Sequence, residues 1–88
     1  MAMQMPWLVY ILRCRDGSLY TGITNDLPKR LHTHTAGKAS RYTRSRLPVT
    51  LVHQEPAPTK SHALKREAAI KRLPRRAKIA LMGPLRRC

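Results

Sequence analysis

The most apolar stretch of the chain is residues 7–14, where β-branched, aromatic and aliphatic side chains occupy both alternating faces. This pattern is typical of a central strand that is covered on two sides. Residues 15–17 carry a turn signal and residues 18–24 continue as a second strand, so the two segments predict a hairpin. Residues 48–54 predict a third strand, which the proline-rich residues 55–58 should end.

The length of the hairpin turn decides which side chains share a face of the sheet. A two-residue turn at Asp16 and Gly17 puts Tyr10 and Tyr20 on opposite faces. A three-residue loop that ends in a left-handed glycine instead pairs Tyr10 with Gly22 and puts both tyrosines on one face. In this second register, Gly22 leaves open space beside the Tyr10 ring. The sequence leaves both registers open.

A helix is expected directly after the second strand. Asp26 is a good N-cap, and apolar and polar positions over residues 27–36 follow the helical period until Gly37. Residues 38–47 are basic and show neither period. They predict an ordered or semi-ordered surface loop.

The C-terminal third predicts two more helices. Ser61 can cap a helix that runs to about Leu73, and Pro74 opens a last helix that ends near Gly83. The order β-β-α-β-α-α predicts a small α/β (α+β) domain, in which helices flank a three-stranded, mostly antiparallel sheet.

The composition adds size and charge to this picture. The 88 residues have room for one domain, with its core at about residues 6–82. The chain has 18 Lys and Arg against 4 Asp and Glu, a net charge of +14, which favours a polyanionic partner. No apolar run reaches the roughly 18 residues of a membrane span, and residues 1–6 show no secretory signal. We therefore expect nucleic acid as the partner, no membrane, and a cytoplasmic location.

The cysteines and histidines do not form a metal-binding pattern. Cys14 and Cys88 form no CxxC pair, and no Cys/His spacing of the zinc-binding kind occurs. We expect two free thiols and no structural zinc. Any metal should then be held mainly by oxygen.

One of the four carboxylates has no local structural role that the sequence can explain. Asp16, Asp26 and Glu55 suit a turn, a helix cap and a proline-bounded loop. Glu67 falls on the apolar stripe of its helix that should face the sheet, where a lone charge is costly. Both a salt bridge, to Lys71 or to an arginine, and a divalent-metal site remain open for it.

The first helix repeats this anomaly. Arg30 and His34 share a face with Leu27 and Leu31, so both should turn toward the sheet. An arginine fixed there suits bidentate phosphate binding, and a neutral imidazole can take or give a proton. A solvated arginine and a partly buried structural histidine are the alternatives.

Five polar positions occur in an order that resembles a known family, the GIY-YIG nuclease superfamily, and most of all its small stand-alone YhbQ-like members. The resemblance covers about residues 6–82. It departs from the family name at the glycine and isoleucine positions, and Ile23 stands where some members have lysine. The matching segments are Val9-Tyr10-Ile11, Tyr20-Thr21-Gly22, Arg30 with Leu31 and His34, and Glu67 within residues 64–68.

This resemblance implies an enzyme, a metal-dependent endonuclease that hydrolyses phosphodiester bonds in DNA with Mg²⁺ or Mn²⁺. A tyrosine in the place of Tyr20 acts with a water or as the base in such proteins, and the counterpart of Tyr10 helps to position the nucleophile and a metal-bound water. Arg30 would stabilise charge on the phosphate and His34 would assist proton transfer. Glu67 would ligate the metal ion.

The basic loop is a candidate for further nucleic-acid contacts. It interleaves one aromatic with four cations, which suits phosphate contacts and stacking on an unpaired base. A merely solvated basic loop is the alternative. The candidate residues are Lys38, Arg41, Tyr42, Arg44 and Arg46.

Two functions of other classes compete with the nuclease. A non-catalytic nucleic-acid-binding protein, associated with RNA or the ribosome, would need the same charge. A structural DNA-coating protein is less well supported, because the chain has only four aromatics and no dimerisation stripe. We expect a monomer with DNA as partner, which either relies on its own basic surface or is brought to its substrate by a targeting protein.

Overall fold

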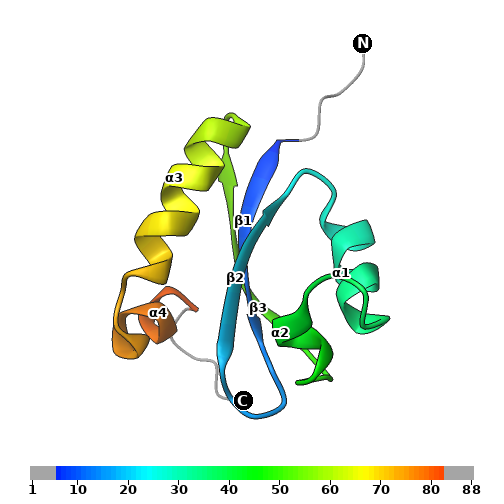
Figure 1. Ribbon diagram of the computed structural model, residues 1–88. Helices are drawn as coiled ribbons and strands as arrows, with labels where there is room; N and C mark the ends of the chain where they lie inside the picture. The colour runs from blue at the N-terminus through cyan, green and yellow to red at the C-terminus, as the bar shows by residue number, and fades with distance from the viewer. Residues whose placement is uncertain (1–5, 83–88) are drawn as a thin grey trace.

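Three strands form one antiparallel sheet in the computed structural model, which describes residues 6–82 (Figure 1). They are β1 (Trp7–Arg13), β2 (Leu19–Thr24) and β3 (Thr50–Ala57), in the spatial order β2-β1-β3. β1 is therefore the central strand, as its apolar faces predict, and β2 and β3 are both edge strands.

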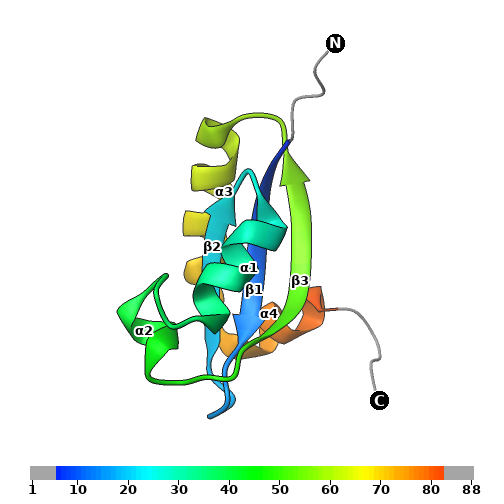
Figure 2. The ribbon, with the colours of Figure 1, turned by 90° about the vertical axis from the view of Figure 1, so that its right-hand side faces the viewer.

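Helices cover both faces of this sheet. α1 (Leu27–Thr35) and the one-turn α2 (Arg41–Arg44) lie on one face, while α3 (Lys60–Lys71) and α4 (Arg75–Leu81) lie on the other (Figures 1 and 2). The predicted order of elements is confirmed, with α2 added to it. The sheet thus separates two small cores. The core under α3 contains Val9, Ile11, Ala57, Ala63 and Ile70, and the core under α1 contains Tyr10, Leu12 and Leu27.

The hairpin has the three-residue loop. Tyr10 pairs with Gly22, and Leu12 pairs with Tyr20. Gly17 ends the loop with φ +87°, a conformation that L side chains rarely adopt. Both tyrosines therefore lie on the face that carries α1, which the second of the two registers predicted.

The third strand differs from its expected bounds. It was predicted over residues 48–54, with a break at residues 55–58, yet pairing continues to Ala57. The expectation treated Pro56 as a breaker, but β3 is an edge strand. A proline is tolerated there because its missing N–H can face away from the neighbouring strand, and Pro56 lies opposite Leu8.

The caps explain how the helices begin. Asp26 caps α1 as predicted, since its side chain accepts a hydrogen bond of 3.3 Å from the Lys29 amide. The basic segment 38–47 is not irregular throughout, because the Ser40 hydroxyl accepts from the Thr43 amide at 3.1 Å and starts α2. A helix of four residues is too short to show a helical period in the sequence.

The third helix begins earlier than expected. Thr59 rather than Ser61 is its cap, and the Thr59 hydroxyl accepts from the His62 amide at 3.2 Å. The last helix was expected to end near Gly83, which lies outside the described residues; α4 ends at Leu81.

Two simpler expectations concern membranes and thiols. Within residues 6–82, no helix is long and apolar enough to cross a membrane. Cys14 is a buried free thiol, as expected, whereas Cys88 lies outside the described residues.

Gly22 lies directly over the Tyr10 side chain. A Cβ at this position would come within 2.6 Å of the Tyr10 hydroxyl oxygen and 2.7 Å of Cζ, far inside contact distance. The absent side chain is the space that the tyrosine fills.

We predict that Gly22→Ala lowers the free energy of unfolding by about 1–3 kcal/mol, because the buried ring has to move. Urea denaturation would measure this. Without the clash, alanine should stabilise a strand by about 0.5–1 kcal/mol relative to glycine. A gain in stability would therefore contradict the described packing.

Candidate active site

The Tyr10 hydroxyl is the centre of the site. Tyr10 is only 1% exposed, and its oxygen lies 2.9 Å from His34 Nε2 and 3.3 Å from Arg30 Nε. Both partners come from α1, one helical turn apart. The sheet-facing stripe predicted for Arg30 and His34 is therefore present, and His34 is fully buried.

The donors and acceptors give this cluster a direction. A guanidinium can only donate, so Tyr10 accepts from Arg30 and, with no other acceptor within residues 6–82, donates its own proton to His34 Nε2. The other ring nitrogen, Nδ1, then carries the proton and donates to the Thr43 hydroxyl at 3.0 Å. Thr43 lies 3.4 Å from the Ser40 carbonyl, which can accept in turn. The chain of hydrogen bonds thus runs from Arg30 to the cap of α2.

Burial sets the protonation states. Desolvation raises the pKa of Tyr10, although the bond from Arg30 opposes it. Desolvation, followed by the charge of Arg30, lowers the pKa of His34. The bond to Tyr10 raises the pKa of Arg30. At neutral pH the cluster is a cation, a neutral phenol and a neutral imidazole.

Tyr20 is the more accessible tyrosine. Its ring centre lies 6.5 Å from that of Tyr10 and 5.3 Å from that of His34. It is half-buried on the edge strand β2, and its hydroxyl contributes to the raised pKa of Arg30. A substrate phosphate at this edge would meet Tyr20 and Arg30 before it met Tyr10.

Glu67 lies on α3, which covers the opposite face of the sheet. It lies on the stripe of α3 that carries the buried Ala63 and Ile70, as its spacing predicted. Its carboxylate pairs with Lys71 Nζ at 3.2 Å, so the salt bridge left open by the sequence is present. The Glu67 charge is also the smallest of the causes that raise the pKa of Tyr10.

The donor set fits one kind of metal. Within the described residues, no three His, Cys, Asp or Glu side chains come together around one point. An all-protein zinc cage is therefore not formed there. Mg²⁺ and Mn²⁺ can be held by one carboxylate together with waters and substrate phosphates, and the half-buried Glu67, 19% exposed, fits that role.

Two of the five loop residues that were predicted to contact nucleic acid already have partners within the protein. The Tyr42 ring stacks on Tyr20 at 6.1 Å and carries the Arg46 guanidinium at 3.9 Å. Arg46 also pairs with Asp16 of the hairpin turn at 3.0 Å. Arg46 thus holds α2 against the hairpin, and Tyr42 already has two partners. The remaining predicted loop contacts, Lys38, Arg41 and Arg44, are exposed.

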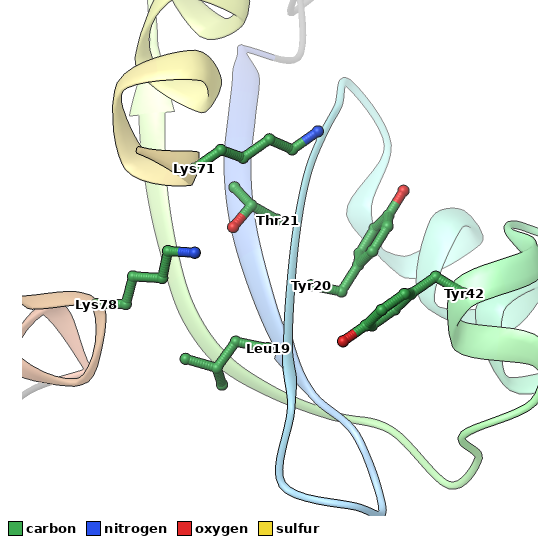
Figure 3. A pocket seen from close by; sticks show the side chains of 6 residues that line it. All are labelled: Leu19, Tyr20, Thr21, Tyr42, Lys71 and Lys78. Atoms are coloured by element: carbon green, nitrogen blue, oxygen red, sulfur yellow. The ribbon is translucent and has the colours of Figure 1, made fainter. Parts of the chain in front are cut away.

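A pocket of about 250 Å³ lies at the exposed edge of β2 (Figure 3). Tyr20 belongs to both this pocket and the Tyr10 cluster. The sequence did not single out Thr43, Lys71 or Lys78 as site residues: Thr43 carries no charge, and the lysines are two among many cations. The pocket is lined by Leu19, Tyr20, Thr21, Tyr42, Lys71 and Lys78.

Comparison with known proteins finds matches that cover most of the chain. The model of the GIY-YIG catalytic domain matches residues 6–80. A UPF0213 protein of Streptococcus sanguinis is 54% identical over 82% of this chain and 83% of its own, and one of Cupriavidus pinatubonensis is 46% identical over 97% and 94%. The solution NMR structure of the UPF0213 protein BH0048 from Bacillus halodurans is 44% identical, with a TM-score of 0.58 over 91% of this chain and 89% of its own.

We predict that Thr43→Val lowers the free energy of unfolding by about 1–3 kcal/mol, because it leaves the buried His34 Nδ1–H without an acceptor. Thr35→Val is the matched control, since the exposed Thr35 hydroxyl bonds only to the Leu31 carbonyl of its own helix. The control should change stability by no more than about 0.5 kcal/mol. Equal effects in chemical denaturation would show that the Thr43 bond contributes nothing.

We predict that stability falls as the pH is lowered from about 7.5 to about 5.5, with a slope of up to about 1.4 kcal/mol per pH unit for one histidine. The folded pKa of His34 is depressed, so the unfolded chain takes up a proton that the folded chain resists. His34→Gln should flatten the profile, whereas His32→Gln, exposed on the same helix, should not. Parallel profiles for all three proteins would contradict a buried neutral imidazole.

Proposed function

This chain belongs to the GIY-YIG catalytic domain family, and we propose that it is a metal-dependent endonuclease that hydrolyses phosphodiester bonds in DNA. The observation that carries this proposal is the arrangement around Arg30. A cation is fixed from behind by the buried Tyr10, beside the half-exposed Tyr20 at the edge of the sheet. An arginine that served only in a structural ion pair would not need to be held between two tyrosines.

Arg30 is the group that stabilises charge on the phosphate. Its Nε is held by Tyr10, which leaves the outer Nη groups to bind phosphate oxygens. Because Tyr10 is held by His34 in turn, the guanidinium is fixed before substrate arrives. Such preorganised charge costs no reorganisation during the reaction.

Tyr20 and Tyr10 take different roles. Tyr20 is accessible, so it orients the attacking water or accepts its proton. Tyr10 is too deeply buried to touch substrate and acts as a positioning residue for Arg30. His34 accepts a hydrogen bond from the Tyr10 hydroxyl and keeps that hydroxyl oriented. Because His34 is fully buried, it can exchange a proton with substrate only by way of Tyr10.

Glu67 would hold the metal ion. Mg²⁺ or Mn²⁺, when bound, supplies charge stabilisation on the phosphoryl oxygens and a more acidic water. Lys71 has to release the carboxylate first. Its side chain is 54% exposed, so the ammonium can move into solvent, whereas the carboxylate is only 19% exposed and stays in place.

The charge of the chain supports nucleic-acid binding. A net charge of +14 and the exposed Lys38, Arg41 and Arg44 should give tight, salt-dependent binding with little dependence on sequence. On this proposal the molecule acts as a single-domain monomer on DNA, through its own basic surface or with a targeting partner.

A non-catalytic nucleic-acid-binding protein is the second candidate. The ion pair between Glu67 and Lys71 favours it, because a carboxylate that is already paired has a structural reason to be there.

We predict that the protein cuts DNA in Mg²⁺ or Mn²⁺ and that Glu67→Gln lowers the rate to below roughly a hundredth of the parent rate. DNA binding in EDTA should be equal or slightly tighter, because the change removes a negative charge. Glu55→Gln is the matched control, since Glu55 of β3 pairs with Arg66 of α3 and with His53. The measurement is the cleavage rate of the parent and of both variants on duplex, flapped and single-stranded substrates.

Two outcomes separate the candidates. If the parent cuts and Glu67→Gln cuts as fast, Glu67 is not the metal ligand. If the parent binds DNA and RNA but never cuts either with Mg²⁺ or Mn²⁺, the binding protein replaces the nuclease.

A further inference from the structure

The pocket at the edge of β2 has the composition of an anion site (Figure 3). Five polar side chains of three kinds line it, and every one can donate a hydrogen bond: two lysines, two tyrosines and a threonine. No carboxylate is among its lining residues. The ligand that matches two cations and several hydroxyls in an open pocket is a phosphate.

The lysines come from the helices that cover the far face of the sheet. Lys71 ends α3 and Lys78 lies in α4, and both extend toward β2 (Figure 3). Tyr42 reaches the same pocket from α2, on the opposite face. The pocket thus spans the exposed edge of β2, where a nucleic-acid strand can pass without meeting a neighbouring strand of the sheet.

The position of the pocket relative to Arg30 identifies which phosphate it takes. Tyr20 lines the pocket and also belongs to the Tyr10 cluster. The pocket is therefore the immediate neighbour of the place where the cleaved phosphate would bind.

We propose that this pocket binds the backbone phosphate of a nucleotide next to the cleaved bond, with Lys78 as its principal cation. Lys71 is the lesser partner, because its ammonium already pairs with Glu67 at 3.2 Å. A phosphate in the pocket attracts Lys71 as well and so weakens its hold on that carboxylate. This inference rests on the proposed function for the identity of the neighbouring site, but the binding itself can be measured without cleavage.

The test compares Lys78→Met with Lys65→Met. Lys65 is exposed on α3 and does not line the pocket, so it controls for the loss of one positive charge. Binding of a short fluorescein-labelled single-stranded oligonucleotide in EDTA is followed by fluorescence anisotropy between about 50 and 200 mM salt. Lys78→Met should reduce the log–log salt slope by about 0.7, the value for one phosphate on a single strand, and weaken binding to all sequences alike. Lys65→Met should leave the slope nearly unchanged.

A thermal melt checks that the variants fold, and Lys78→Gln replaces Lys78→Met if the latter does not. Equal slopes for the Lys78 and Lys65 variants would overturn the proposal. Inorganic phosphate at matched ionic strength separates a backbone site from a free-phosphate site. Displacement from the parent that is lost in the Lys78 variant supports a backbone phosphate in the pocket. If inorganic phosphate binds the parent through Lys78 but does not weaken oligonucleotide binding, the pocket is a site for free phosphate alone, and the proposal is wrong.

The outcome is distinct from that of the nuclease assay. A parent that cuts DNA while Lys78 makes no difference to binding keeps the proposed function and removes this site. If the parent never cuts but Lys78→Met loses one phosphate contact, the nuclease is ruled out and the phosphate-binding pocket is retained.

Discussion

The buried Tyr10 hydroxyl is the constraint on which the site depends. It fits under Gly22 because glycine has no side chain; a Cβ at this position would come within 2.6 Å of the hydroxyl oxygen. The hydroxyl lies between Arg30 and His34 of α1. Each feature follows from the one before. The three-residue turn sets the register, the register places Gly22 opposite Tyr10, and the tyrosine then reaches the helix and fixes the guanidinium.

A second feature is that the proposed site draws on both faces of the sheet. α1 carries Arg30 on one face and α3 carries Glu67 on the other, and β2 is the edge strand at which nucleic acid could approach. The charge of Glu67 is the smallest of the causes that raise the pKa of Tyr10. An edge also leaves room for a long polyanion, which a closed pocket would not.

Much of this arrangement could be predicted from the sequence, because each part leaves a periodic or turn signal. The apolar faces of residues 7–14 identified the central strand, and the helical spacing identified the inward stripes that carry Arg30, His34 and Glu67. The hairpin register stayed open, because the sequence permits two loop lengths and each gives a different pairing. Only the structure selects the one in which Tyr10 faces Gly22.

What the sequence could not supply are contacts between elements far apart along the chain. Thr43 bonds to His34 because α2 folds back onto α1, and four residues of helix leave no period to read. Arg46 looked like a free cation but pairs with Asp16, thirty positions away. Lys78 joins the pocket only because α4 turns toward β2.

The most direct measurement is anomalous diffraction from crystals grown with Mn²⁺ and an oligonucleotide that resists cleavage at one phosphate. The account predicts a manganese peak at the Glu67 carboxylate, with the Lys71 ammonium moved away, and the resistant phosphate in hydrogen-bond reach of Arg30 beside Tyr20. A structure in which the oligonucleotide lies elsewhere while Glu67 keeps its pair with Lys71, with no manganese at the β2 edge, would contradict it.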